Sequence, residues 1–237
     1  MRALRILLIL VVIFGALFVA ADRIAVHFAE SKAADRVQQT QGLTSKPEID
    51  IKGFPFLTQV LAKKLDDVEV TANGIEATGT GGQTLRVDRF QADLHGVRMS
   101  NGFSSAVADT ATGSATLSYE DLSKAAPTGV KVGYGGTAAD GKGRVKVSAD
   151  ISTPIGDIQR SVVSEISVTA KNSIKLTAGE IPGLDALPSE VGDLLRERID
   201  FTRALAGLPQ GIELTSVTAT PEGITVEATG TKVVLAN

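Results

Sequence analysis

The sequence predicts a β-rich α+β fold, in which a twisted antiparallel sheet wraps amphipathic helices behind an N-terminal membrane helix. An unbroken apolar run, Ile6–Ala21, lies near the start of the chain. From Lys46 onward, apolar residues alternate with polar ones, which is the period of a half-buried strand. Two later stretches place apolar residues at helical spacing. With 237 residues, 43% of them hydrophobic, the chain is long enough to bury a substantial core.

The composition argues against several classes of function. A net charge of −3 offers no basic stripe for nucleic acid, and 4% aromatic residues without Trp disfavour the stacking of bases. The chain contains no cysteine, which excludes disulfides, thiolate zinc sites, cysteine nucleophiles and a lipid-modified cysteine. We therefore expect no nucleic-acid partner.

Residues 1–21 have two interpretations, a signal peptide or a membrane anchor helix. The Ile6–Ala21 run would form a helix of about 24 Å at about 1.5 Å per residue, which is short for a bilayer core of about 30 Å. Small residues before Asp22 would suit cleavage at that point. As an anchor, the helix would instead continue into residues 22–40. In both cases Arg2 and Arg5 stay on the inner side, so the body faces outward.

After the apolar run we expect a charged, Ala-rich helix and linker over residues 22–45, then a β-rich domain over residues 46–237. Asn73-Gly74 is a hairpin signal. The alternation shifts by one residue within the strand that contains Arg89, which predicts a β-bulge there. Ser118–Ala126 is predicted to form a helical turn stopped by Pro127, and Leu187–Phe201 is the strongest helix pattern of the domain.

The stretch Gly53–Val70 (GFPFLTQVLAKKLDDVEV) organises the domain. A Gly-Phe-Pro-Phe corner precedes a helical pattern that places Leu57, Val60, Leu61 and Leu65 on one face. Lys63 and Lys64 would lie on the other face, near the helix C-terminus. Two interpretations remain open, an ordinary core helix with its lysines in water, and a helix that closes a sheet over an apolar channel.

No pattern of catalytic residues emerges from the sequence. The loop from Gly136 to Lys142 has the spacing of a phosphate loop, but Gly143 replaces the magnesium-binding Ser or Thr and a strand follows. The adjacent Asp66 and Asp67 would point to opposite faces of a strand. Neither His27 nor His95 has a ligand partner at metal-binding spacing, and no G-x-S-x-G elbow is present. We therefore expect a protein that is not an enzyme and holds no metal or cofactor.

Several segments together resemble the LmeA-like family of phospholipid-binding proteins of the actinobacterial cell envelope. The most specific segment is GFPFLTQVLAKKLDDVEV; the others are the N-terminal apolar segment with its charged helix, ATLSYEDLSKA, and the terminal TSVTATPEGITVEATGTKVVL. The resemblance covers nearly the whole chain. The chain also looks like the tubular lipid-binding architecture, in which twisted strands wrap a helix around an apolar tunnel.

The resemblance implies a non-catalytic, extracytoplasmic phospholipid-binding protein at the plasma membrane, which supports lipomannan-type envelope glycolipid assembly or lipid transfer. The lipid could be anionic, and an envelope glycosyltransferase is the expected protein partner. The expected lipid-binding residues are Phe54, Phe56, Leu57, Val60, Leu61, Lys63 and Lys64, with Leu57, Val60 and Leu61 lining the tunnel and Phe54 and Phe56 at its mouth. The alternative is a scaffold module for such a glycosyltransferase, without a lipid ligand.

Overall fold

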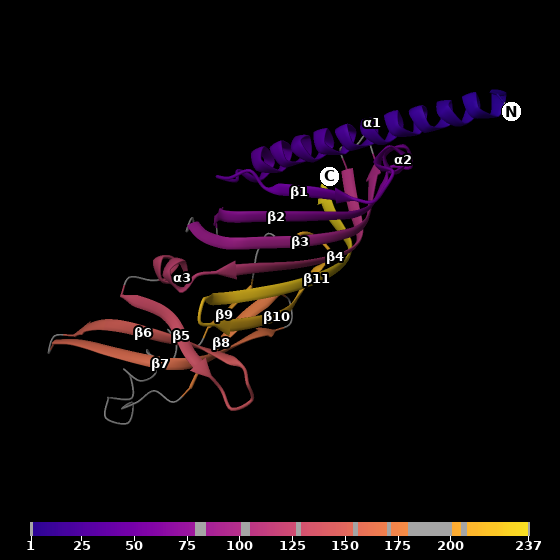
Figure 1. The fold of residues 1–237 in the computed structure, drawn as a ribbon. Helices are drawn as coiled ribbons and strands as arrows, with labels where there is room; N and C mark the ends of the chain where they lie inside the picture. The colour runs from indigo at the N-terminus through magenta and orange to yellow at the C-terminus, as the bar shows by residue number, and fades with distance from the viewer. Residues whose placement is uncertain are drawn as a thin grey trace.

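The fold was analysed in a computed structural model, which describes residues 2–78, 84–100, 105–126, 129–153, 156–169, 172–179, 201–204 and 208–236. It begins with one helix, α1 (Arg2–Gln41), which passes from the apolar run into the charged stretch without a break. The predicted continuation of the helix beyond Asp22 is therefore confirmed. The first half of α1 projects beyond the rest of the molecule, and its second half lies along one edge of a sheet (Figure 1).

The larger sheet has six antiparallel strands in the order β1-β2-β3-β4-β11-β10. A short helix, α2 (Phe56–Leu61), lies between β1 and β2 in the chain. The strands are β1 (Glu48–Lys52), β2 (Lys64–Thr78), β3 (Thr84–Ser100), β4 (Ser105–Leu117), β10 (Ile212–Thr220) and β11 (Gly223–Ala236). We call this the large sheet.

A second antiparallel sheet of five strands follows the chain order β5-β6-β7-β8-β9, so the prediction of a single sheet is wrong. The β-rich α+β class is confirmed. Helix α3 (Tyr119–Ala125) forms at the predicted helical turn and connects the two sheets, and its N-cap Ser118 accepts the Asp121 N–H. The strands are β5 (Val130–Thr137), β6 (Gly143–Thr153), β7 (Gly156–Thr169), β8 (Ser173–Ala178) and β9 (Phe201–Ala204).

One asparagine side chain joins the two sheets. Asn172, in the turn between β7 and β8, donates from Nδ2 to the Ile212 carbonyl at 2.9 Å and accepts from the Leu214 N–H at 2.9 Å. It thereby imitates the pairing of a neighbouring strand at the edge of β10. At a second point the sheets approach so closely that a Cβ on Gly143 would lie 1.7 Å from the Ala219 carbonyl oxygen.

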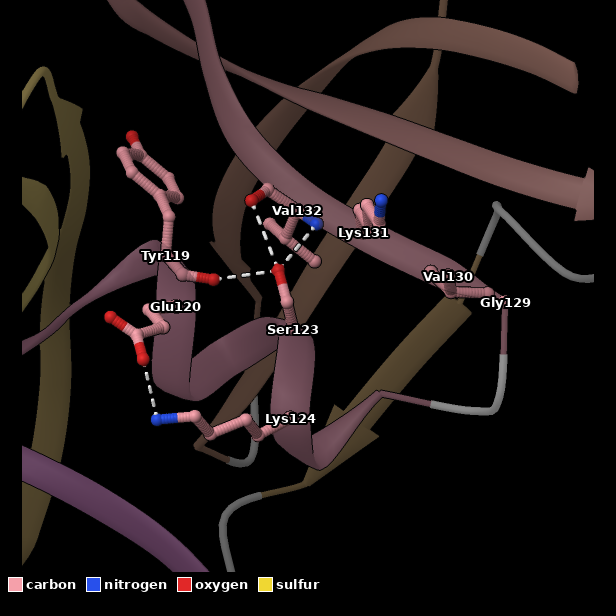
Figure 2. Close-up of a pocket in the computed structure, with 8 residues that line it drawn as sticks. All are labelled: Tyr119, Glu120, Ser123, Lys124, Gly129, Val130, Lys131 and Val132. Atoms are coloured by element: carbon pink, nitrogen blue, oxygen red, sulfur yellow. Dashed lines mark hydrogen bonds and ion pairs between the residues drawn. The ribbon is translucent and has the colours of Figure 1, made fainter.

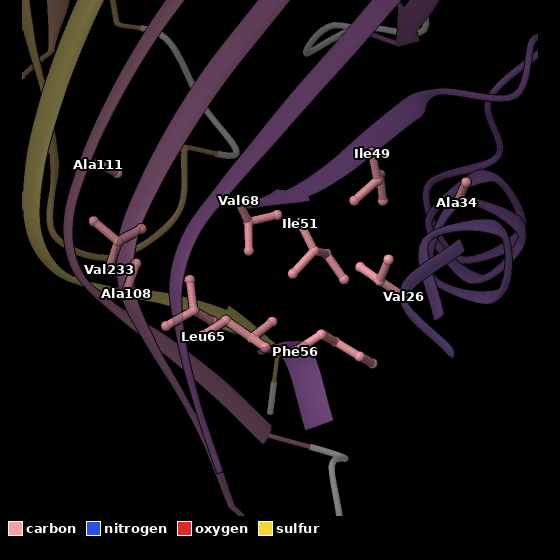
Figure 3. Packing of buried hydrophobic residues seen from close by; sticks show 11 residues of the cluster. Val26, Ala34, Ile49, Ile51, Phe56, Leu65, Val68, Ala108, Ala111 and Val233 are labelled. Carbon is pink, nitrogen blue, oxygen red and sulfur yellow. The ribbon is translucent and has the colours of Figure 1, made fainter. Parts of the chain in front are cut away.

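The large sheet curves around an apolar cluster that α1 and α2 close from one end (Figure 3). Helix α1 contributes Val26 and Ala34, and α2 contributes Phe56. The strands contribute Ile49, Ile51, Leu65, Val68, Val97, Ala108, Ala111 and Val233. A second cluster lies where α3 and the smaller sheet meet β10 and β11. Burial of apolar area is the main driving force for folding, so these two clusters are the core.

A row of residues with unusual backbone conformation bends the large sheet. Gly96 in β3 has φ of 62°, and Lys232 in β11 has φ of 52°; both lie beside Asp109 of β4. Across this row, the last inward-facing residue on one side and the first on the other are three positions apart instead of two, as Leu65 and Val68 are in β2. The strands shift together, so β2–β3 and β3–β4 keep their register.

The same device explains two wrong predictions. Asn73-Gly74 forms no hairpin, because β2 runs unbroken through it with Gly74 at φ of 61°. No bulge occurs at Arg89, which pairs in register with Asn73 and Thr116. The shift in alternation is real, but it is taken up by a positive-φ glycine in the neighbouring strand rather than by an inserted residue.

Of two further helix predictions, one is wrong and the other lies almost wholly outside the described residues. Helix α2 ends at Leu61, so Leu65 belongs to β2, and Lys63 and Lys64 do not lie on a helical face. The chain leaves the helix because Lys63 adopts φ of 54° and its carbonyl accepts the Met99 N–H at 2.9 Å. The predicted helix Leu187–Phe201 lies outside the described residues except for Phe201, which begins β9.

Replacement of Gly96 by Ala tests the bend. The new Cβ would meet Asp109 Oδ2 at 2.5 Å at a positive φ, so we expect the free energy of unfolding to fall by about 1–3 kcal/mol. Thermal unfolding of the full chain in detergent, followed by circular dichroism, measures this. Gly133→Ala in β5 is the control, because no atom lies within 4 Å of the added Cβ. Equal stability of the two variants would contradict the assigned role of Gly96.

Candidate lipid-binding surface

Helix α2 is attached to α1 through a buried carboxylate. The Asp22 side chain is 0% exposed, and its Oδ1 accepts the Leu57 N–H, in the first turn of α2, at 2.8 Å. Its Oδ2 accepts a hydrogen bond from Arg23 at 2.7 Å. The first N–H groups of a helix have no partner within the helix, so Asp22 supplies one. Because Asp22 directly follows the apolar run, α2 is held at the point where that run ends.

Gln59 fixes the other side of the corner. Its buried side chain donates from Nε2 to the Lys52 carbonyl at 3.2 Å and accepts the Asp66 N–H on Oε1 at 2.8 Å, bridging the end of β1 and the start of β2. Gly53, at φ of 94°, leaves room for it, since a Cβ there would lie 2.6 Å from Gln59 Nε2. Sequence reasoning missed both Asp22 and Gln59, although a carboxylate directly after an apolar run was a visible signal.

The seven predicted site residues fall into two groups. Phe56 is 5% exposed in the core, and Leu57 and Val60 pack, half-buried, against the same cluster. These three residues form the inner group. Phe54 is 59% exposed and Leu61 84% exposed, and Lys63 and Lys64 are also exposed. These four residues form the outer group. The structure therefore does not bring Leu61 to the same interior as Leu57 and Val60, and Phe56 lies in the core rather than at a mouth.

The inner face of the large sheet continues from the inner group toward the second cluster. Its middle row consists of small apolar side chains, which leave the face shallow there. In this row Val70 pairs with Ala92, Ala92 with Gly113, and Gly113 with Ala228. All four residues are half-buried. The next row, Ala72, Phe90, Ala115 and Val226, reaches the second cluster. An apolar strip thus joins the two clusters along one face.

A depression of about 470 Å³ lies between α3 and the start of β5 (Figure 2). It is lined by Tyr119, Glu120, Ser123, Lys124 and residues Gly129–Val132. Its volume is in the range of small-ligand pockets. It shows how the chain is fastened here: the Ser123 hydroxyl donates to the Tyr119 carbonyl at 2.7 Å and accepts the Val132 N–H at 2.8 Å.

Most polar side chains that line this depression have hydrogen-bond or ion-pair partners. Lys124 forms an ion pair with Glu120 at 2.7 Å, and the Tyr119 hydroxyl donates to the Thr220 carbonyl at 2.7 Å. Burial raises the pKa of Tyr119 to about 12, so this phenol stays protonated at neutral pH. A nucleophilic serine needs a neighbouring base, whereas the recorded hydrogen bonds of Ser123 are with backbone groups. The side chains around this depression therefore have a structural role, in which Ser123 links α3 to β5.

The two histidines do not form a metal site with the described residues. His95 on β3 contacts Asp67 of β2 across the strand pair, on the exposed face of the sheet. His27 lies 3.7 Å from Glu30 on α1. Within the described ranges, no group of three or more His, Cys, Asp or Glu side chains gathers at one point.

Comparison with known proteins gives one match. A family model described as LmeA-like phospholipid-binding matches residues 20–229. The match begins beside Asp22 and includes α2, strands β1 to β10 and the first half of β11. No curated protein and no solved structure matches the chain.

The joint between α1 and α2 can be tested at Asp22. Asp22→Leu leaves the Leu57 N–H without an acceptor in a buried position, so we expect the melting temperature to fall by on the order of 5 °C. Asp22→Asn keeps an oxygen at Oδ1 and should retain most of the stability. Thermal melts of both variants of the full chain check the order. Equal losses for Leu and Asn would contradict the role of the Leu57 hydrogen bond.

Proposed function

The chain belongs to the LmeA-like phospholipid-binding family, and from this we propose that it binds phospholipid without chemical turnover at the outer face of the plasma membrane, with α1 retained as its anchor. The observation that carries the proposal is the continuity of α1, which joins an exposed apolar half to a half packed on the sheet. A binding protein so built keeps its apolar face beside the membrane that supplies the lipid.

The first half of α1 has the properties of a membrane span. Large apolar side chains from Leu4 to Val19 are exposed, and α1 is long and apolar enough to cross a bilayer. Residues 3–21 would extend about 28 Å at about 1.5 Å per residue, close to a bilayer core of about 30 Å. Arg2 precedes this segment and Arg5 lies in its first turn, which favours a cytoplasmic N-terminus and an outward-facing body.

We place the acyl chain of the bound lipid along the inner face of the large sheet, with Phe56, Leu57 and Val60 at one end. Each buried CH₂ group contributes about 0.8 kcal/mol, so an apolar strip suffices for binding. Ala92 and Ala228 carry only a methyl group and Gly113 has no side chain, so this row fills less of the volume above the sheet than larger residues would. This arrangement uses no catalytic group, in keeping with a lipid-binding family.

The bound lipid would serve envelope glycolipid assembly of the lipomannan type, or transfer of lipid, with an envelope glycosyltransferase as protein partner. Family membership and the orientation argued from Arg2 and Arg5 support this role. A scaffold for the same enzyme would need the anchor and the body, but no lipid.

Co-purified lipid tests the function. We expect an organic extract of the full chain, purified in a non-phospholipid detergent from its native host, to contain phospholipid in a fixed ratio to protein by mass spectrometry. Ala92→Trp or Val60→Trp should lower that ratio severalfold, with the melting temperature nearly unchanged. Gln91→Trp is the control, because Gln91 neighbours Ala92 but is exposed.

Two outcomes would contradict this proposal. A wild-type chain free of lipid would favour the scaffold. If Ala92→Trp costs about 1–3 kcal/mol of stability, as overpacking of a dense core does, and lipid remains bound, the inner face is core and the acyl chain lies elsewhere.

A reporter fused after Asn237 tests the topology. We expect it to be active only outside the cytoplasm, because the arginines before the apolar segment hold the N-terminus inside. N-terminal sequencing of the mature protein separates the anchor from a cleaved signal. Cytoplasmic activity of the reporter would contradict the outward orientation, and a chain that starts at Asp22 would contradict the anchor.

A further inference from the structure

The outer side of the α2 corner carries an unusual apolar surface. Phe54 and Leu61 are 59% and 84% exposed, and outside α1 no other large apolar side chain is exposed among the residues whose burial the structure describes. Gly53 and Gln59 fix the corner rigidly from below, so the two side chains are held outward by a defined backbone. Exposed apolar groups on a rigid corner indicate a contact surface.

The position of this corner identifies what it contacts. Asp22 holds α2 at the residue that follows the apolar half of α1, and the Arg23 guanidinium lies 5.3 Å from the centre of the Phe54 ring. In Figure 1, α2 lies at the end of the sheet beyond which the apolar half of α1 projects. A bilayer crossed by that half of α1 would begin at the level of the corner.

The charges beside the corner also suit contact with a bilayer. Lys63 and Lys64 follow α2 directly and are exposed, and neither forms an ion pair with any described residue. Lys46, Lys52 and Lys124, by contrast, are paired with carboxylates. Apolar side chains next to unpaired lysines are typical of segments that lie in the interface of an anionic membrane.

We infer that Phe54 and Leu61 insert into the interfacial layer of the leaflet in which α1 ends, while Lys63 and Lys64 contact its anionic phosphate groups. This inference rests on the proposed anchor role of α1. Helix α2 then lies between two lipid environments. The outer group, at the corner around α2, touches the bilayer, and the inner group, Phe56, Leu57 and Val60, faces the apolar strip. The corner is the entrance by which a phospholipid leaves the leaflet for the inner face.

Site-specific labelling tests the contact, because the chain has no native cysteine. Leu61→Cys and Phe54→Cys of the full chain, each carrying an environment-sensitive fluorophore, are reconstituted into nanodiscs of phosphatidylcholine and phosphatidylglycerol in equal parts. We expect both labels to shift to the blue and to be quenched by lipids bearing a nitroxide near the headgroup. Asn73→Cys, exposed in the same strand that follows α2, is the control and should remain in water.

The lysines are tested in the same background. Lys63→Glu combined with Lys64→Glu should lower the quenching of the Leu61 label severalfold in the mixed nanodiscs and have little effect in pure phosphatidylcholine. The difference should fade at high salt, since exposed charges are screened within about 10 Å at about 0.1 M salt. Thermal melts in detergent verify that the charge variant remains folded.

The outcomes separate this inference from the proposed function. Labels at Leu61 and Phe54 that stay as accessible to water as that at Asn73, in a protein that still carries co-purified lipid, would overturn the membrane contact alone. Shielded labels in a chain that carries no lipid would support the contact and overturn the lipid-binding proposal. Shielding that requires added membrane proteins would assign the corner to a protein partner and overturn the inference.

Discussion

The buried carboxylate of Asp22 is the contact on which the arrangement of the molecule depends. A carboxylate without exposure to water must be satisfied by hydrogen bonds, and the Leu57 N–H and the Arg23 guanidinium provide them. Helix α1 can therefore neither slide nor rotate against α2 without a large energetic cost. Val26 and Ala34 extend the same attachment into the core. The orientation of the apolar half of α1 relative to the large sheet is therefore fixed.

The curvature of the large sheet is a property of its backbone. Two residues at positive φ, Gly96 in β3 and Lys232 in β11, lie on either side of Asp109 in β4, so the inward-facing residues change parity together. A shift in one strand alone would turn its apolar side chains to water. Because the strands shift together, the inner face stays apolar on both sides of the bend, and its strip reaches from α2 to the second cluster.

Local patterns in the sequence predicted local structure well. The continuity of α1, the strands from Lys46 onward and the short helix α3 all depend on residues close in the chain. The sequence did not predict where α2 ends. The Lys63 carbonyl accepts the N–H of Met99, which is distant in sequence, and this hydrogen bond draws the chain from the helix into β2. The unbroken β2 strand and the second sheet likewise depend on pairing across the chain. At the candidate lipid-binding site, residue type and spacing identified α2 as an apolar segment. Only the structure separates the inner group from the outer group.

Two residues of helix α2, Gln59 and Leu61, have the opposite exposure to that expected on a water-facing surface. Its polar Gln59 is buried and bound to backbone groups, whereas its apolar Leu61 is 84% exposed. In water this arrangement costs free energy in two ways, because the glutamine side chain is desolvated and the leucine side chain is exposed to water. The hydrogen bonds of Gln59 offset the first loss. The second loss disappears only if the outer side of α2 faces an apolar medium. If the projecting half of α1 spans a membrane as proposed, its attachment to α2 through Asp22 would bring the bilayer to that side.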